Sequence, residues 1–310
     1  MHRIDGPGAT VDKKFTEGDP TGGVPATVVT AAWMTDVQEE LITVLSSAGI
    51  TPAKGAQDQL LKAIRTIASG VVGQVRNLKM SVTAASATAT LTADEVIVET
   101  ALGGLRYCLP SFSKTINLAT TGVGGMDTGA APASGYVAIY AIYNPTTGAS
   151  GLLATNAASN QPAVYGGANM PAGFTASGLI SVWTTTAASL FVPGFQIERK
   201  VSFGQVQVLN TAVQQAALTT IAIANAVPQN AKMCSFLMAC TATSSSSITC
   251  VIAGSATGAI GQRNMSIAPS TGINLSAADM PIVAPQNINY LATVSAGTMS
   301  LQIYVTDFTF

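Results

Sequence analysis

Charged residues are scarce in this chain, and the shortage restricts the partners that it can have. Only 9% of the 310 residues are Asp, Glu, Lys or Arg, and the formal net charge is −1. An ordinary soluble domain carries about 25% charged residues. With so little charge and no excess of basic residues, neither nucleic acid nor an anionic membrane surface is favoured as a partner.

The sequence also lacks a long apolar run. Mean hydropathy is +0.40, yet Gly, Ser, Thr, Asn and Gln interrupt every hydrophobic stretch before it could cross a bilayer. The first residues, 1–5, contain none of the apolar core of a secretory signal. We therefore expect synthesis in the cytoplasm and no membrane insertion.

Histidine is almost absent, and cysteine does not occur in metal-binding patterns. His2, in the N-terminal arm, is the one histidine of the sequence. A single histidine in that place excludes His-based catalytic triads and histidine metal clusters. Cys240 and Cys250 flank a serine run and could face each other across a hairpin. Buried, reduced thiols are the favoured state for a protein made in the cytoplasm, and we expect it for all four cysteines. No metal or cofactor is predicted. The remaining two cysteines are Cys108 and Cys234.

Carboxylates are sparse beyond residue 70, which argues against hydrolytic chemistry. A glycosidase needs two carboxylates at a set separation. The glycine-rich segments 122–125 and 254–261 are read as turns, because no Walker lysine follows either of them. We predict that the chain is not an enzyme and has no catalytic residues. The acids after residue 70 are Asp94, Glu95, Glu99, Asp127, Glu198, Asp279 and Asp307.

Two segments between residues 30 and 70 repeat with the period of an α-helix. Thr30 is placed to cap the first helix, and Gly49 to end it. The short link that contains Pro52 predicts a helical hairpin. The apolar stripes, expected to pack as its core, are Trp33, Met34, Val37, Leu41, Val44 and Leu45 in the first segment and Leu60, Leu61, Ile64, Ile67 and Ala68 in the second.

Several motifs occur in fixed order within residues 1–69. An arm rich in Gly, Pro, Asp and Lys leads into Trp-x₄-Gln-Glu-Glu-Leu at 33–41, then Ala-Gly-Ile-Thr-Pro at 48–52 and Gln-Leu-Leu-x-Ala-Ile at 59–64. This series resembles the N-terminal module of tail fibre and receptor-binding proteins of tailed bacteriophages, which also occurs in phage-tail-like bacteriocins. The resemblance implies attachment to the tail or baseplate through the N-terminus, a distal fibre beyond it, and a homotrimer. The residues assigned to tail attachment are Trp33, Asp36, Gln38, Glu39 and Glu40.

From residue 78 onward the pattern changes to that of β-strands. The segment Tyr136–Tyr143 is apolar on both faces, so we expect it to be covered on both sides. Short strands at about ten-residue spacing follow after residue 200, as in β-sandwiches and jelly rolls. The predicted fold is mainly β with an N-terminal α-helical hairpin, and its β-sandwich-like domains belong to an elongated, trimeric fibre.

The distribution of charged residues and the change from helical to β-strand periodicity divide the chain into four parts. No charge lies between Asp127 and Glu198, and the charges in 201–310 sum to zero. Surfaces with so few charged residues are expected to be buried against other copies of the chain, which favours trimerisation. The expected parts are an extended arm at 1–29, the tail-attachment hairpin at 30–70, a β-rich shaft or middle domain at 75–200, and a C-terminal receptor-binding β-sandwich at 201–310.

The leading hypothesis is a structural virion protein located in the phage tail. It would bind tail or baseplate proteins at one end and a bacterial surface receptor, glycan or protein, at the other. Residues 254–274 are the most loop-like polar stretch near the C-terminus, and within them we assign receptor binding to Arg263 and Asn264. Two alternatives stay open: a purely structural baseplate connector that carries another adhesin, and a short depolymerase spike.

Overall fold

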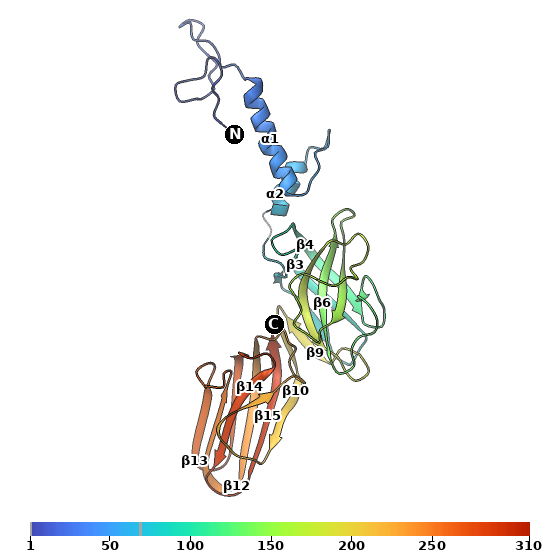
Figure 1. The fold of residues 1–310 in the computed structure, drawn as a ribbon, viewed down its shortest axis with the longest axis vertical. Helices are drawn as coiled ribbons and strands as arrows, with labels where there is room; N and C mark the ends of the chain where they lie inside the picture. The colour runs from blue at the N-terminus through green and yellow to red at the C-terminus, as the bar shows by residue number, and fades with distance from the viewer. Residues whose placement is uncertain (1, 68–69) are drawn as a thin grey trace. The chain divides into compact units, whose positions relative to one another are not determined.

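The computed structural model describes residues 2–67 and 70–310 and is mainly β, with a small helical region near the N-terminus (Figure 1). The chain divides into two compact units, Met1–Ser69 and Gly70–Phe310. The helices lie in the first unit and the strands in the second. We refer to them as the helical unit and the β unit.

Helix α1 spans Ala31–Ser47, and its two ends are formed as the sequence predicts. The Trp33 amide donates to the Thr30 hydroxyl at 3.3 Å, which identifies Thr30 as the N-cap. At the other end, Gly49 adopts a φ of 67° and its amide donates to the Ser46 carbonyl at 2.9 Å. The Ile50 amide donates to the Leu45 carbonyl at 2.9 Å, completing a Schellman motif.

Helix α2 spans Gln59–Ile67 and pairs with α1, but the apolar stripes do not form the predicted core. Among the described residues, only Leu45, Ala48 and Ala63 make up the buried cluster of this unit. Helix α1 is about 25 Å long and α2 about 13 Å, so α2 can cover only part of its partner. Ala68 lies outside the described residues. Exposed apolar positions remain at Met34, Leu41, Leu60, Leu61, Ile64 and Ile67.

The arm before α1 doubles back on itself where an extended segment was expected. The Val28 amide donates to the Pro7 carbonyl at 2.8 Å, and the Thr27 hydroxyl donates to the Gly8 carbonyl at 2.9 Å. Gly8 has a φ of 76°, and a Cβ there would lie 2.4 Å from the Ala26 carbonyl oxygen. Glycine therefore permits the close approach of the two backbones that an extended arm would not have.

The β unit contains fifteen strands in one hydrogen-bonded network. Its path runs β11-β14-β12-β15-β10-β9-β2-β3-β8-β6-β7-β5, with β1 and β4 on β3 and β13 on β12. The sheet is mixed because β5 and β7 pair in parallel. The strands are β1 Val75–Arg76, β2 Lys79–Val82, β3 Thr88–Glu99, β4 Arg106–Asn117, β5 Gly125–Met126, β6 Tyr136–Asn144, β7 Ala149–Asn156, β8 Ala176–Thr184, β9 Gly194–Ile197, β10 Lys200–Thr211, β11 Gln215–Ala222, β12 Met233–Ala253, β13 Arg263–Pro281, β14 Asn287–Val294 and β15 Met299–Thr309.

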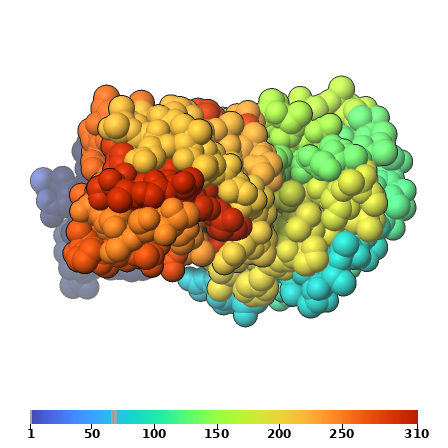
Figure 2. Space-filling view, turned by 90° about the horizontal axis from the view of Figure 1, so that it is seen from below, coloured from blue at the N-terminus to red at the C-terminus, as the bar shows by residue number. Residues whose placement is uncertain are grey.

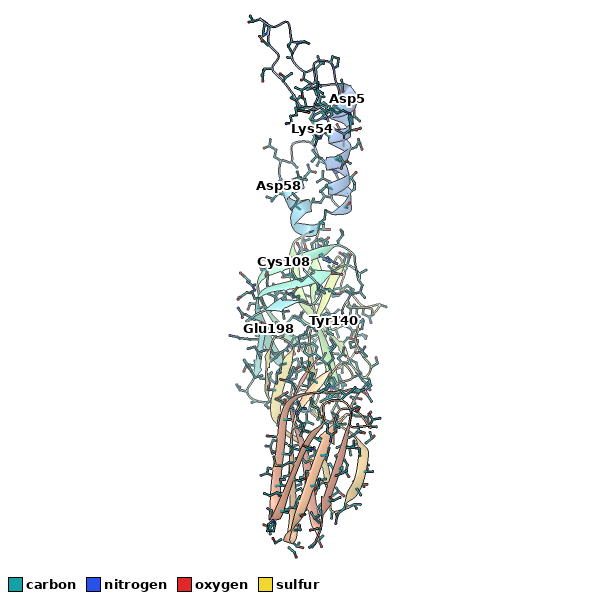
Figure 3. All side chains as sticks on the ribbon, turned by 90° about the vertical axis from the view of Figure 1, so that its left-hand side faces the viewer. Asp5, Lys54, Asp58, Cys108, Tyr140 and Glu198 are labelled. Atoms are coloured by element: carbon teal, nitrogen blue, oxygen red, sulfur yellow. The ribbon has the colours of Figure 1, made fainter. Side chains whose placement is uncertain are left out.

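Strand β6 is the buried centre of the first part of the β unit. It lies between β7 and β8, and its residues are buried on both faces, as the apolar sequence predicts. Tyr140 lies in the interior (Figure 3), and its hydroxyl donates to the Pro162 carbonyl at 2.8 Å. This bond satisfies the one polar group of a side chain that is otherwise surrounded by the core.

Strand β12 runs through the serine segment, where the sequence allows a hairpin between Cys240 and Cys250. Its first part, 233–242, pairs with β15, and its last part, 248–253, pairs with β14. Strand β13 follows β12 along both parts, and the register shifts between Thr241 and Ser246. The expected hairpin at the serine run is therefore a bend within one long two-stranded ribbon.

Strand β10 connects the last part of the β unit to the preceding strands. It pairs with β9 on one side and with β15 on the other. The guanidinium of Arg199 donates to the carbonyls of Gly73 and Leu179 and lies 5.2 Å from the centre of the Phe310 ring. The domain boundary expected at residues 200 and 201 falls within β10.

Candidate functional site

Two of the residues assigned to tail attachment hold the N-terminal arm against α1. The indole Nε1 of Trp33 donates to the His2 carbonyl at 3.1 Å, and its ring meets Phe15 edge-on at 5.3 Å. Asp36 lies 2.7 Å from Nδ1 of His2. Trp33 and Asp36 thus organise the arm, and any partner that binds there meets an ordered surface.

The other three assigned residues line the exposed side of α1. Gln38, Glu39 and Glu40 are all exposed, and the Gln38 amide approaches the Glu39 carboxylate at 3.4 Å. They are separated from the buried cluster around Leu45. The structure therefore brings Trp33 and Asp36 together and leaves the Gln-Glu-Glu run as a separate polar surface.

Replacing Asp36 by Asn is expected to lower the pKa of His2. The hydrogen bond to Asp36 is the main cause that raises this pKa above 6.5, and Asp5 adds to it. Because the pKa of His2 is higher in the folded than in the unfolded chain, the stabilisation from the charged His2–Asp36 contact is fully present below the unfolded-state pKa. It is lost as the pH rises through the folded-state pKa. An NMR titration of His2 measures the change. Asp12→Asn is the control, and an unchanged pKa in Asp36→Asn would contradict the contact.

Arg263 and Asn264 lie on a strand, not in the loop that the sequence predicts. The loop is confined to residues 254–262, and both residues begin β13, where they are exposed and pair with Ile252 and Val251. A Cβ at Gly254 would meet the carbonyl oxygen of Pro281, and Pro281 pairs with Met233. Because Met233 pairs with Thr309, and Thr309 with Lys200, this loop lies at the end of the sheet where β10 leaves β9.

Two loops and the bend of the β12–β13 ribbon gather at the opposite end of these strands, which we call the distal rim. The Thr243 amide donates to the Thr298 carbonyl at 3.1 Å, and the Ser247 amide donates to the Ser295 hydroxyl at 2.9 Å. Figure 2, seen from below, looks toward this end, where segments from residue 201 onward form the surface. The rim comprises residues 211–215, 242–247, 270–272 and 295–298.

The distal rim contains no charged and no aromatic residue. Its side chains are Ser, Thr, Gln, Ala and Val, and most of them are exposed. The sequence does not predict this rim, because its four segments are far apart in the chain and meet only through the bend in β12 and the strand register. The serine run at 244–247 is the available signal, but the sequence indicates only that a hairpin could lie there.

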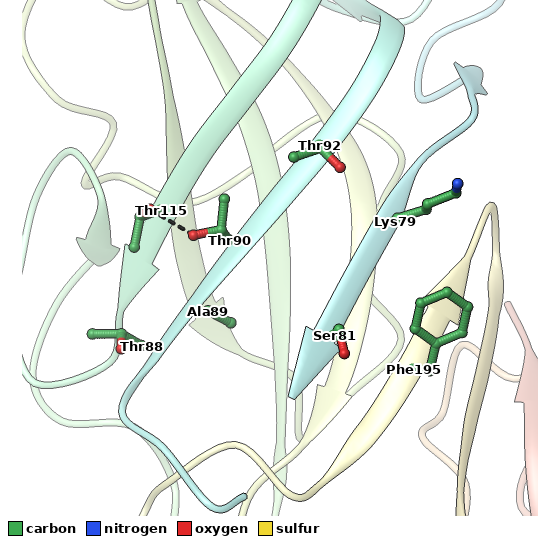
Figure 4. Close-up of a pocket in the computed structure, with 8 residues that line it drawn as sticks. All are labelled: Lys79, Ser81, Thr88, Ala89, Thr90, Thr92, Thr115 and Phe195. Carbon is green, nitrogen blue, oxygen red and sulfur yellow. Dashed lines mark hydrogen bonds between the residues drawn. The ribbon is translucent and has the colours of Figure 1, made fainter. Parts of the chain in front are cut away.

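A shallow hollow of about 490 Å³ lies on the outer face of β2, β3, β4 and β9. Figure 4 shows Lys79 and Phe195 on one side of it and threonines on the other, with the hydroxyls of Thr90 and Thr115 2.8 Å apart. No lining residue carries a carboxylate, so the hollow offers hydroxyl, ammonium and aromatic contacts but no acid–base pair. The lining residues are Lys79, Ser81, Thr88, Ala89, Thr90, Thr92, Thr115 and Phe195.

The carboxylates of the β unit form structural contacts. The ammonium of Lys200 lies 2.8 Å from Asp279 and 3.4 Å from Asp307, and Ser235 donates to Asp307 at 2.7 Å. The hydrogen bond to Asp279 is the main cause that raises the pKa of Lys200. The other pairs are Asp94 with Asn77, Glu95 with Cys108, Glu99 with Arg106, Asp127 with Tyr165 and Glu198 with the Asn77 amide.

The four cysteines are free thiols in the structure. Burial is confirmed for Cys234, Cys240 and Cys250, but Cys108 is exposed. Desolvation, followed by the hydrogen bond to Glu95, raises the pKa of Cys108 to about 11. Cys240 and Cys250 lie on either side of the bend in β12, and their thiols share a hydrogen bond.

Within residues 2–67 and 70–310, no three His, Cys, Asp or Glu side chains gather as metal ligands would. No helix in the described part of the chain is long and apolar enough to span a membrane.

Comparison with known proteins gives one partial similarity. No protein-family model matches the chain. A segment of 73 residues is 41% identical to the uncharacterized protein StfP of Escherichia coli (strain K12). The match covers 22% of this chain and 35% of StfP, so the chain spans about a third of the length of this relative. A shared segment of this size indicates common ancestry of that segment, and function must be argued from the site.

Proposed function

We propose that the chain is a structural virion protein, a homotrimeric tail fibre of a tailed bacteriophage. Its helical unit attaches to the tail or baseplate, and the last part of its β unit binds a receptor on the bacterial surface. One observation carries the proposal: a compact helical unit, whose motif series resembles a tail-attachment module, precedes a separate β unit. This division matches the two tasks of a fibre, which must be held at one end and bind at the other.

The attachment surface combines the ordered arm with the polar side of α1. Trp33 and Asp36 fix the arm through His2, and the exposed Gln38, Glu39 and Glu40 present amide and carboxylate groups beside it. A tail or baseplate protein with basic side chains would complement these acids.

The receptor surface is proposed to be the distal rim, with Arg263 and Asn264 as the second candidate. The rim carries hydroxyl and amide groups and no charge, so its contacts with a glycan or protein must be short-range hydrogen bonds and apolar contacts. Single contacts of this kind are weak. Three copies on one fibre would raise the overall affinity without any new contact.

The finer architecture follows from the strand pairing of β12. Strands β13, β12, β15 and β10 would form one layer, and β13, β12, β14 and β11 the other, giving a β-sandwich-like domain. A trimer of such domains would make an elongated fibre and cover part of a surface that has few charges.

Two alternatives use the same fold. A baseplate connector would keep the attachment surface and bind another adhesin at the rim in place of a receptor. A depolymerase spike would need a free pair of carboxylates, but the seven acids of the β unit contact Lys200, Arg106 and other polar groups. These contacts favour binding over hydrolysis.

Removing residues 1–69 tests the division of tasks. We expect the shortened chain to keep its β-rich circular dichroism spectrum and its binding to host cells, because the two units have separate cores. It should no longer sediment with tails when mixed with particles that lack the protein. Aggregation of the shortened chain, or continued assembly into tails, would contradict the proposal.

A further inference from the structure

The two helices of the helical unit leave large apolar side chains uncovered within that unit. Met34 and Leu41 on α1 are 53% and 44% exposed, and Leu61 and Ile64 on α2 are 50% and 53% exposed. An isolated helix as short as α2 is marginal in water and depends on packing for its stability. Because Ala63 is the one described side chain of α2 that joins the buried cluster, contact with α1 alone gives α2 little support.

The spacing of the uncovered residues indicates what covers them. Along α1, the exposed Met34 and Leu41 alternate with the half-buried Val37 and Val44 at intervals of three, four and three residues, and Val44 also packs against the buried cluster around Leu45. This is the heptad spacing of helices that pack side by side, and in a parallel symmetric assembly such a stripe meets its own copy at the same height. A stripe with this spacing is therefore complementary to itself.

The absence of charge from the apolar stripe also fits a second copy of the chain as the partner. No charged residue lies in the stripe, while Glu39 and Thr43 lie on the opposite side of α1 and are exposed. The six exposed side chains, which are 40–53% exposed, present roughly 500 Å² of surface per copy, against about 800 Å² per partner for a standard interface. A contact between copies would therefore also include neighbouring polar residues.

We propose that this apolar face is the seam at which the helical units of identical chains pack together. We define the seam by Met34, Val37, Leu41 and Val44 on α1 and by Leu60, Leu61, Ile64 and Ile67 on α2. The inference rests on the proposed function only for the number of copies, three. It places self-association next to the tail-attachment surface, so that joining of the chains and docking on the tail occur in the same unit.

Cysteine cross-linking in the full chain tests the seam directly. The background is Cys108→Ser, because Cys108 is the exposed native thiol. In this Cys108→Ser background, the variant Leu41→Cys is compared with the variant Glu39→Cys, because Glu39 lies on the opposite side of the same helix. Under mild oxidation with oxidised glutathione, thiol–disulfide exchange joins the introduced thiols of two copies and releases two reduced glutathione molecules. We expect at least a tenfold higher yield of covalent dimer for Leu41→Cys.

Equal yields at the two positions, or no dimer at position 41, would overturn the proposal. A second pair of variants measures the same seam without oxidation. Leu41→Glu with Ile64→Glu should lower the molar mass in sedimentation equilibrium or weaken self-association at least tenfold, whereas Thr43→Glu with Ser46→Glu should not. If the face is covered by another segment of the same chain, cross-links fail and the mass is unchanged. Neither readout involves bacteria or tails, so failure here is distinct from failure of receptor binding.

Discussion

Arginine at three positions of the distal rim is expected to reduce binding to host cells at least about a hundredfold. Ser244, Thr271 and Ala296 are exposed and belong to three different segments of the rim. A bulky charged side chain in each would block the close approach that short-range hydrogen bonds require. A loss of about 1.4 kcal/mol of binding free energy at one position already lowers the affinity tenfold. The effect is multiplied because a trimeric fibre carries three copies of the altered rim.

The measurement is adsorption of fluorescently labelled full-length variants to cells of the host. The second candidate surface is tested in parallel by Arg263→Ala with Asn264→Ala at the other end of the same strands; if the rim is the receptor surface, this variant should change binding less than twofold. Circular dichroism confirms that both variants are folded. If this second variant loses binding and the rim variant keeps it, the receptor surface is the start of β13 and not the rim.

Replacing Trp183 by Ala is expected to destabilise the β unit by about 3–5 kcal/mol. Its side chain is 1% exposed, its Nε1 donates to the Val192 carbonyl at 2.9 Å, and its ring meets Phe191 edge-on. Truncation would leave a cavity and remove the hydrogen bond to the Val192 carbonyl. Urea unfolding followed by circular dichroism at a β-sheet wavelength gives the free energy of unfolding.

Phe195→Ala is the control for this stability measurement. Phe195 is 43% exposed and lines the shallow hollow on the outer face of the sheet, so its loss should cost less than about 1 kcal/mol. Similar losses for the two variants would show that Trp183 is not part of a well-packed core.

Local features of the chain could be predicted from the sequence. The cap at Thr30 and the end at Gly49 depend on hydrogen bonds between residues a few positions apart. The covered strand β6 was recognisable because both of its faces are apolar. In each case the signal lies within one short segment, and no knowledge of distant neighbours is needed.

Features that depend on distant neighbours could not be predicted. The apolar stripe of α1 has the pattern of a buried face, but its burial depends on the length of α2 and on any further partner. Residues 263–269 of β13 are exposed on both faces, so the alternation that marks a half-buried strand is missing and the segment has the composition of a loop. The distal rim exists only because β12 bends, and no local signal fixes the pairing of its two parts.

Immunogold electron microscopy of tailed particles that carry this chain tests the central claim most directly. An antibody against residues 201–310 should label the free ends of fibres that project from the tail, and an antibody against the N-terminal arm should label the tail or baseplate. Labelling of the capsid, or of no part of the tail, would contradict a role as a tail fibre.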